Sequence, residues 1–315
     1  MSARAVGLLL GFAADRLLGD PRRFHPVAGF GTAATALERR LYADSRASGA
    51  AHAAALVGAA IMLGVAAERA ARHPVAQAGA TAMATWTVLG GRSLEREALA
   101  VDAHLTVGDL PAARQRLTHL VGRDTSALEA PEVARAVVES VAENTSDAVV
   151  APLVWGAVAG VPGLLAYRAA NTLDAMVGHH NDRYERFGWA AARLDDLVNL
   201  PGSRLAAAAT LLASPGTAGA AARAWRRNAA AHPSPNAGVV EAAFAGALGI
   251  RLGGTNRYYG DRVEHRAVMG DGRSARPEDI GCAAQLARRV GIISAMVSAC
   301  GALLVARRTH RAGVR

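Results

Sequence analysis

Apolar residues run along this chain in long blocks, and polar residues gather between them. Five stretches of near bilayer-spanning length contain no Asp, Glu or Arg: Ala47–Ala67, His73–Gly91, Ala148–Tyr167, Leu205–Ala222 and Val290–Ala306. A helix needs about 20 mostly apolar residues to cross a bilayer. The pattern therefore predicts an all-α, polytopic integral membrane protein. Each stretch alone also fits a buried helix of an alanine-rich soluble bundle.

Proline and glycine interrupt two of these stretches. Pro152 and Pro162 lie in Ala148–Tyr167, and Pro215 lies in Leu205–Ala222. If both stretches crossed the membrane, the polar segments on either side of the first would lie on opposite faces, although both carry candidate chemistry. We therefore expect at least one of the two not to cross fully. Arginines in nearly every loop leave the orientation open.

The polar segment 92–147 has the pattern of a soluble helical insert within one membrane-embedded domain of residues 1–315. A helix is expected to about Val107, a second after Asp109, and a third from Pro131, because proline is favoured in the first helical turn. No segment shows the alternation typical of a strand.

Composition narrows the classes of function. Charged residues make up 19% of the chain, the hydrophobic class 51% and aromatic residues 4%, and all 35 basic residues are arginine. Without lysine, a Schiff base with pyridoxal phosphate and a P-loop are both excluded. The net charge of +9 is spread between apolar segments, which argues against nucleic acid as a partner. We interpret the arginines as membrane flanks and as ligands for anionic small molecules. The two cysteines, Cys282 and Cys300, are expected in the core.

Polar clusters stand at the edges of the apolar stretches, where ionisable groups are costly and mark candidate sites. A Gly- and Pro-rich turn holds Asp20 and His25. Glu139, Glu143 and Asp147 recur every four residues, which stacks three carboxylates on one helical face and suits a cation such as Mg²⁺. A capped turn and a solvated acidic face are the respective structural alternatives.

Two further clusters have helical spacing. Asn171 and Asp174 are three residues apart, and Gly178 continues their face without a side chain. The next cluster, RLDDLVN, begins at Arg193. Its alternative interpretation is an intrahelical ion pair followed by a cap. This cluster contributes the following candidate residues: Arg193, Asp195, Asp196 and Asn199.

The last cluster consists of two loop-like segments. HPSPNAG holds His232, Ser234 and Asn236, and the glycine-rich GGTNR holds Asn256 and Arg257. Rigid loops of this kind can present backbone N–H groups or an arginine to a phosphate. Ordinary loops are the alternative.

These clusters resemble the adenosylcobinamide-phosphate synthase family of cobalamin biosynthesis (CobD/CbiB). The strings that carry the resemblance are DRLLGDPRRFHPVAGFG, ESVAENTSDAVVAPL, YRAANTLDAMVGHHNDRYERFGWAAARLDDLVNLPGSRL, HPSPNAG and RLGGTNRYYG. The resemblance as a whole runs in order from about Val6 to Val305. One departure is Ala148, where many relatives have glycine after the aspartate.

The resemblance implies a multi-pass protein of the cytoplasmic (inner) cell membrane that forms an amide. The free propionate of adenosylcobyric acid would be joined to (R)-1-amino-2-propanol or its O-phosphate, with ATP as co-substrate. An acyl phosphate would activate the carboxylate, and Mg²⁺ would bind phosphate oxygens. The expected partners are the corrinoid, the aminopropanol and membrane lipid. Homo-oligomers and contacts with other proteins of the pathway are left open.

Roles follow as expectations from this chemistry. The catalytic candidates are His25, Glu139, Glu143, Asp174 and Arg193. The substrate-binding candidates are Asp20, Asn144, Asn171, Asn199, His232, Ser234, Asn236, Asn256 and Arg257. The metal-ligand candidates are Glu143, Asp147, Asp174, Asp195 and Asp196. Two other functions stay open: a metal-dependent membrane prenyltransferase and a non-catalytic membrane sensor or corrin transporter.

Overall fold

The computed structural model describes residues 2–21, 25–179, 181–257 and 263–312. It divides into two compact units that interleave along the chain. Unit 1 comprises Met1–Gly90, Asp147–Gly202 and Ala295–Arg315, and unit 2 comprises Gly91–Ser146 and Ser203–Ser294. The segment predicted as an insert thus belongs to a unit that also includes a long later part of the chain.

Unit 1 is built from helices. They are α1 (Ala3–Leu18), α2 (Pro26–Leu41), α3 (Arg46–Ala70), α4 (Pro74–Val88), most of the π-helical turn η1 (Ser146–Val150), α8 (Ala151–Val177), the part of α9 (Trp189–Ala213) up to Gly202, and the C-terminal part of α12 (Glu278–Ala312). Ser2 and Ser45 cap α1 and α3 by accepting backbone N–H groups. Histidine side chains cap α2 and α4, and each of these helices has proline in its first turn.

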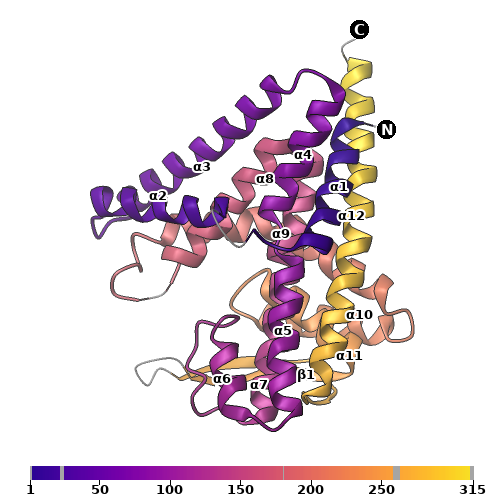
Figure 1. Ribbon diagram of the computed structural model, residues 1–315. Helices are drawn as coiled ribbons and strands as arrows, with labels where there is room; N and C mark the ends of the chain where they lie inside the picture. Colours follow the sequence, from indigo (N-terminus) through magenta and orange to yellow (C-terminus); the bar gives the residue numbers. More distant parts are fainter. Residues whose placement is uncertain (1, 22–24, 180, 258–262, 313–315) are drawn as a thin grey trace. The chain divides into compact units, whose positions relative to one another are not determined.

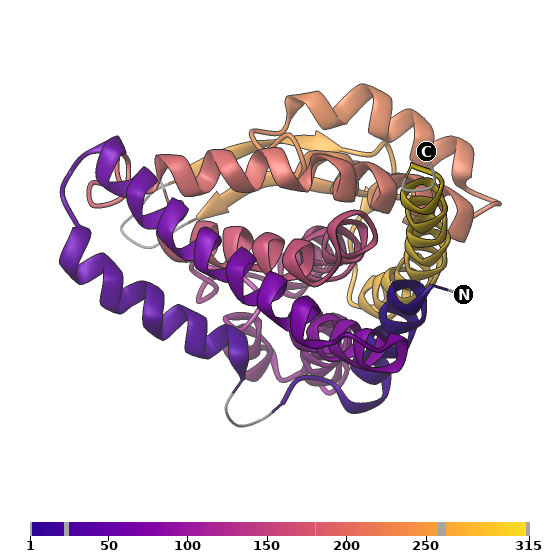
Figure 2. The same cartoon turned by 90° about the horizontal axis from the view of Figure 1, so that it is seen from above.

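Small residues let α1 and α4 pack closely (Figure 1). A Cβ at Gly7 would lie 2.5 Å from Thr81 Cβ, and a Cβ at Gly11 would lie 2.5 Å from Ala82 O. The two glycines form a small-xxx-small pattern on an apolar helix, which is typical of close helix contacts in membranes. The C-terminal part of α12 lies beside α1 (Figure 2), and its buried alanines share an apolar core with Leu8.

Helix α8 is broken within its apolar sequence. Gly160 has φ 68° and ψ −146°, and Pro162 follows, so regular helical hydrogen bonds are lost at this point. Arg4 Nη1 donates to the carbonyls of Ala157 at 3.4 Å and Val158 at 3.2 Å. Glu68 Oε1 accepts the N–H of Val161 at 2.9 Å. Side chains of α1 and α3 thereby satisfy the backbone groups that the break exposes.

Unit 2 contains helices and a small sheet. The helices are α5 (Gly91–Thr106), α6 (Leu110–Leu117), α7 (Ala130–Thr145), α10 (Ala218–Asn228), the 3-10 turn η2 (Ala229–Ala231) and α11 (Ala237–Leu248). In the described part of the chain, β1 (Ile250–Arg257), β2 (Val263–Met269) and β3 (Arg273–Ser274) form a sheet of order β2-β1-β3. β1 is antiparallel to β2 and parallel to β3.

The sheet was not expected from the sequence. Its pairing shifts register between Leu252 and Gly254, and Gly253 and Gly254 both have positive φ. This irregularity removes the regular alternation by which a strand is recognised. The predicted glycine-rich loop at GGTNR is therefore the end of a strand.

Helix positions otherwise follow the apolar pattern. Among the described residues, three helical stretches are long and apolar enough to cross a membrane: Arg46–Ala70, Ala130–Val177 and Glu278–Arg307. The chain is an all-α membrane protein with a small sheet. Leu205–Ala222 is divided between α9 and α10 by a turn after Ala213 and is not one of these stretches. The expectation of buried cysteines was wrong, because Cys282 and Cys300 lie on exposed positions of α12.

Candidate functional site

Helices α8 and α9 bring polar residues together in unit 1. Asn199 Nδ2 donates a short hydrogen bond to Asp147 Oδ1. Asn171 Nδ2 donates to Asp195 Oδ1 at 3.3 Å. Asp195 is 8% exposed and Asn199 1%. We call this set the α8–α9 cluster, and its members are Asp147, Tyr167, Arg168, Asn171, Asp174, Asp195 and Asn199.

Local packing explains how the two helices meet there. A Cβ at Gly202 would lie 2.7 Å from Ala151 Cα, so only glycine permits this approach of α9 to the start of α8. Trp155 Nε1 donates to the carbonyl of Val198 at 2.7 Å. These contacts hold Asn199 beside Asp147.

Sequence reasoning missed two members of this cluster, Tyr167 and Arg168. Tyr167 is 2% exposed. Arg168 Nη1 donates to Asn171 Oδ1 at 3.4 Å, and the charges of Asp20, Asp147 and Asp15 act on this guanidinium. A signal was present, because Arg168 is the arginine that ends the apolar stretch of α8 and precedes the Asn171–Asp174 pattern.

The other predicted residues of unit 1 make mainly local contacts. His25 Nδ1 accepts the N–H of Val27 at 3.2 Å and so caps α2. The carboxylate of Asp174 lies so close to Gly178 that a Cβ there would collide with it. Arg193 and Asp196 form the predicted i,i+3 ion pair at 3.6 Å. Burial raises the pKa of Asp196 above its ordinary value, and the nearby guanidinium opposes this shift.

The regular spacing of the acidic residues on α7 ends at a π-helical turn. Ser146–Val150 is π-helical, so the four-residue repeat that relates Glu139 to Glu143 does not continue regularly through Asp147. The predicted stack of three carboxylates on one α-helical face therefore does not extend unchanged to Asp147. Such turns within α-helices are frequent at functional sites.

Glu139 is held by three partners in unit 2. Its carboxylate accepts Arg123 Nη2 at 2.9 Å and the N–H of Gly253 at 2.8 Å, and Arg135 Nη1 lies 3.6 Å away. Arg135 also donates to the carbonyls of Gly253 and Thr255. Glu139 and Arg123 are 5% and 6% exposed. The carboxylate thus ties α7 to β1.

Glu241 on α11 is a buried carboxyl that the set of site residues chosen from the sequence did not include. It is 1% exposed, and neither carboxylate oxygen has a hydrogen-bond partner among the described residues. His232 Nε2 lies 3.8 Å from Oε1. Burial, and then the charges of Glu139 and Glu143, hold the pKa of Glu241 well above its ordinary value. The signal available in the sequence was an isolated Glu in the apolar run AGVVEAAFAGAL.

Side chains of the HPSPNAG segment fold the loop around itself. His232 Nδ1 accepts the N–H of Ser234 at 3.0 Å, and Ser234 Oγ accepts the N–H groups of Asn236 and Ala237. Asn236 Oδ1 accepts Ser203 Oγ at 2.9 Å and Arg204 Nη1 at 2.8 Å. The loop is therefore rigid, as expected, and its polar side chains contribute to that rigidity.

The remaining predicted residues are Asn144, Glu143, Asn256 and Arg257. Asn144 Nδ2 donates back to the carbonyl of Ser140 at 2.9 Å, and Glu143 is partly exposed one residue earlier. The backbone of Asn256 and Arg257 lies in β1, but their side chains are outside the described part of the structure.

The carboxylates do not fit a metal ion held by three protein ligands. Within the described ranges, no three His, Cys, Asp or Glu side chains converge so as to hold one. Asp147 and Asp195 are instead oriented by asparagine amides. Mg²⁺ often keeps several waters and binds substrate phosphates with one or two carboxylates. Its predicted binding here stays a prediction.

Buried polar clusters lie on apolar helices of this membrane protein, and such clusters are typical of a catalytic or binding site. A family model described as CobD/Cbib protein matches residues 8–287. The chain belongs to this CobD/Cbib family, as the sequence predicted.

Named relatives agree with this assignment. The chain is 50% identical over 313 residues to "Cobalamin biosynthesis protein CobD" of Mycobacterium tuberculosis (strain CDC 1551 / Oshkosh), covering 98% of this chain and 96% of the relative. Proteins of the same name match from Geobacter metallireducens, at 46% identity over 86% of this chain and 88% of the relative, and from Chromobacterium violaceum, at 44% over 96% and 97%. No solved structure was found to match the chain. Cobalamin biosynthesis is therefore the process in which this family acts.

Proposed function

We propose that this protein is the amide-forming ligase of its pathway, joining the free propionate of adenosylcobyric acid to (R)-1-amino-2-propanol or its O-phosphate. Membership of the CobD/Cbib family over residues 8–287 is the observation that carries the proposal. The buried α8–α9 cluster supports it, because a structural scaffold has no need of several acidic groups packed between apolar helices.

The reaction requires activation of a carboxylate. A propionate oxygen attacks the γ-phosphorus of ATP, ADP leaves, and an acyl phosphate forms. The ammonium ion loses a proton to a base, and the amine nitrogen then attacks the acyl carbon. Phosphate leaves with the C–O electron pair, and the nitrogen loses a second proton. Lysine is absent from the chain, so arginine and backbone N–H groups are the donors available for the phosphate oxygens.

The α8–α9 cluster suits the amine. An aliphatic amine is a cation at neutral pH, and acidic groups outnumber Arg168 in this cluster. Asn171 and Asn199 orient Asp195 and Asp147 through hydrogen bonds from neutral amide groups. His25 is the proposed acceptor of the amine proton, and Asp174 is a second one because it belongs to the cluster. The contacts of Glu139 favour a positioning role for that residue.

The inner cell membrane is the proposed location, with ATP and Mg²⁺ supplied as the nucleotide complex. Three apolar stretches long enough to cross a bilayer support a multi-pass arrangement. The corrinoid carries many peripheral amides, for which the asparagines on α7 to α9 offer hydrogen bonds. Pyridoxal phosphate has no role in this chemistry, which forms no Schiff base.

The test incubates detergent-purified protein with adenosylcobyric acid, Mg-ATP and aminopropanol O-phosphate and follows the corrinoid by mass spectrometry. A mass gain equal to the amine minus water is expected. Corrinoid retention or release without covalent change would instead favour the sensor or transporter, and consumption of a prenyl pyrophosphate would favour the prenyltransferase.

A matched pair of variants connects the reaction to the cluster. Asp195→Asn removes a buried carboxylate charge that Asn171 orients, and it should raise the KM for the amine at least about tenfold, the effect of one lost charge-assisted contact. Asp271→Asn changes an exposed acid in the turn before β3 and should leave the kinetics unchanged. Equal kinetics for both variants would remove Asp195 from the proposed site.

A further inference from the structure

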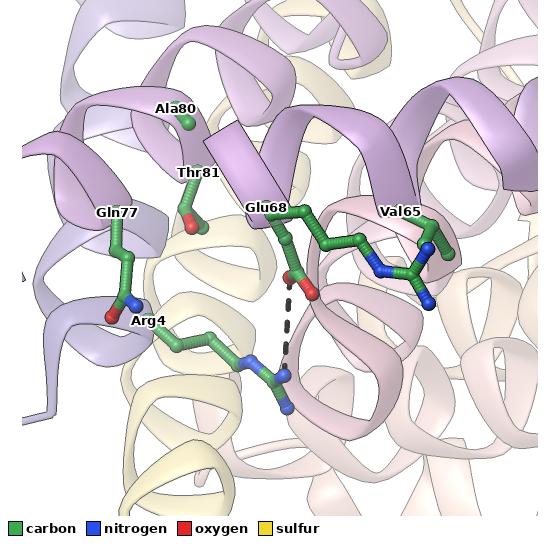
Figure 3. Close-up of a pocket in the computed structure, with 7 residues that line it drawn as sticks. Arg4, Val65, Glu68, Gln77, Ala80 and Thr81 are labelled. Carbon is green, nitrogen blue, oxygen red and sulfur yellow. Dashed lines mark ion pairs between the residues drawn. The ribbon is translucent and has the colours of Figure 1, made fainter. Parts of the chain in front are cut away.

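A polar cavity of about 340 Å³ lies in unit 1, apart from the α8–α9 cluster. Residues of three helices line it: Arg4 of α1, Glu68 and Arg69 near the end of α3, and Gln77 and Thr81 of α4. In Figure 3, the side chains of Arg4 and Glu68 point toward one another across this space, and Gln77 and Thr81 form another side of it. The volume is that of a site for a small polar group.

Two of the charged side chains are held in place before any ligand arrives. Arg4 Nη2 lies 3.9 Å from Glu68 Oε1, and Arg4 Nη1 bonds to the carbonyls at the break in α8. Glu68 accepts the N–H of Val161. The side chains of Arg4 and Glu68 are still 30% and 36% exposed. Their orientation is thus fixed by backbone contacts while part of each head group remains accessible.

The charges of the lining favour an anion of low charge. Two guanidinium groups, those of Arg4 and Arg69, stand against the one carboxylate of Glu68. A single positive charge remains, which one phosphodiester would neutralise. Arginine N–H groups match phosphate oxygens in geometry, and the Gln77 amide and Thr81 hydroxyl are suited to hydrogen bonds with neighbouring hydroxyl groups.

The surroundings of the cavity are those of a membrane edge. Helix α3 is long and apolar enough to cross a bilayer, and Arg69 lies in its last turn. Just before that turn, Met62 and Leu63 of α3 are each 64% exposed, and Val75 at the start of α4 is 73% exposed. Exposed apolar side chains next to a cationic cavity suit a molecule with a charged head and hydrocarbon chains.

We propose that this cavity binds the phosphodiester headgroup of an anionic glycerophospholipid, with its acyl chains along the exposed apolar side chains of α3 and α4. Bound lipid would bridge α1, α3 and α4 at the break in α8. It would thereby reinforce the packing of unit 1 without taking part in the amide-forming reaction.

Native mass spectrometry of the full chain, released from detergent micelles doped with phosphatidylglycerol, tests this proposal. The wild-type protein should retain phosphatidylglycerol in preference to phosphatidylcholine, whose choline cation would meet the two guanidinium groups. Arg69→Gln should weaken the apparent affinity for phosphatidylglycerol about tenfold, as expected for one lost charge-assisted hydrogen bond. This variant leaves the contacts of Arg4 and Glu68 at the helix break in place.

Arg72→Gln is the matched control, because Arg72 is an exposed arginine three residues further along that does not line the cavity. It should bind phosphatidylglycerol as the wild type does. Equal loss in both variants would mean diffuse attraction to the membrane surface and would overturn the proposal. So would full retention by Arg69→Gln, or displacement of the lipid by an equal concentration of glycerol phosphate, which would identify a soluble phosphate ester as the occupant.

Discussion

The stability of unit 2 should depend on pH through Glu241, and the substitution Glu241→Gln should remove this dependence. Its carboxyl is buried without a hydrogen-bond partner among the described residues, and burial together with the charges of Glu139 and Glu143 raises its pKa well above the ordinary value. In the unfolded chain, the same carboxyl regains an ordinary pKa. At a pH between these two pKa values, Glu241 is protonated in the folded protein and ionised in the unfolded chain.

The sign of the effect follows from proton linkage. Stability rises with pH only where the unfolded state binds more protons, and here the folded state binds more. The contribution of Glu241 to the free energy of unfolding is therefore fully present below the ordinary pKa of glutamate. It is lost progressively as the pH rises toward the raised pKa, by about 1.4 kcal/mol for each pH unit. Gln has no proton to release, so Glu241→Gln lacks this slope.

Unfolding by SDS titration in a mild detergent, at about pH 5 and about pH 6, measures the difference. Across that unit, the free energy of unfolding of the wild type should fall relative to that of Glu241→Gln, by up to about 1.4 kcal/mol. Glu278→Gln removes an exposed carboxyl at the start of α12 and should keep the wild-type slope. Parallel pH slopes for the wild type and Glu241→Gln would refute the reasoning, because Glu241 would then titrate alike in both states.

Three further predictions concern packing, ion pairing and activity. Gly11→Ala places a Cβ against α4 and should lower the free energy of unfolding by about 1–3 kcal/mol. Gly79→Ala is the control: a Cβ at Gly79 meets no atom within 4 Å, so this change should raise the free energy of unfolding by up to about 1 kcal/mol. The same SDS titration measures both variants. Arg123→Ala leaves buried Glu139 short of a partner and should cost about 3–5 kcal/mol in that assay, and a loss below about 1 kcal/mol would contradict the assigned tie between α7 and β1. Arg168→Gln should slow formation of the amide product at least about tenfold by mass spectrometry, while a wild-type rate would exclude Arg168 from the site.

The sequence predicted helices where burial and length decide the structure. Ala47–Ala67 and Val290–Ala306 lie within α3 and α12, and the expected starts after Asp109 and at Pro131 agree with α6 and α7. These signals are local, since capping and apolar length act within a few turns. The strand β1 was missed because its two positive-φ glycines and register shift disrupt the alternation.

Site residues could be predicted where polar groups recur at helical spacing, but two charged groups beside or within apolar stretches were missed. The spacing of Asn171 and Asp174 on α8, and of Asp195 and Asn199 on α9, pointed to faces that each contribute to the α8–α9 cluster. Arg168 lies three residues before Asn171 at the end of an apolar stretch, and Glu241 lies alone in an apolar run. Both were left out of the candidate set although the sequence held these signals, and the fold shows what surrounds them. The partner of Asn199, an aspartate 52 residues earlier, also follows from tertiary packing, which no local pattern contains.

The hydrogen-bond donors that the structure shows for the buried carboxylates differ in kind between Glu139 and the α8–α9 cluster. Arg123 neutralises Glu139, whose second oxygen accepts a backbone N–H, so its charge and lone pairs serve the attachment of α7 to β1. Asparagine amides donate to Asp147 and Asp195, and the charge of Asp147 also acts on the Arg168 guanidinium. A neutral donor fixes the direction of a carboxylate without adding a charge of its own, so acidic groups still outnumber Arg168 in this cluster. Substitutions in the α8–α9 cluster should therefore affect catalysis more than stability. Substitutions of Glu139 should affect stability more than catalysis.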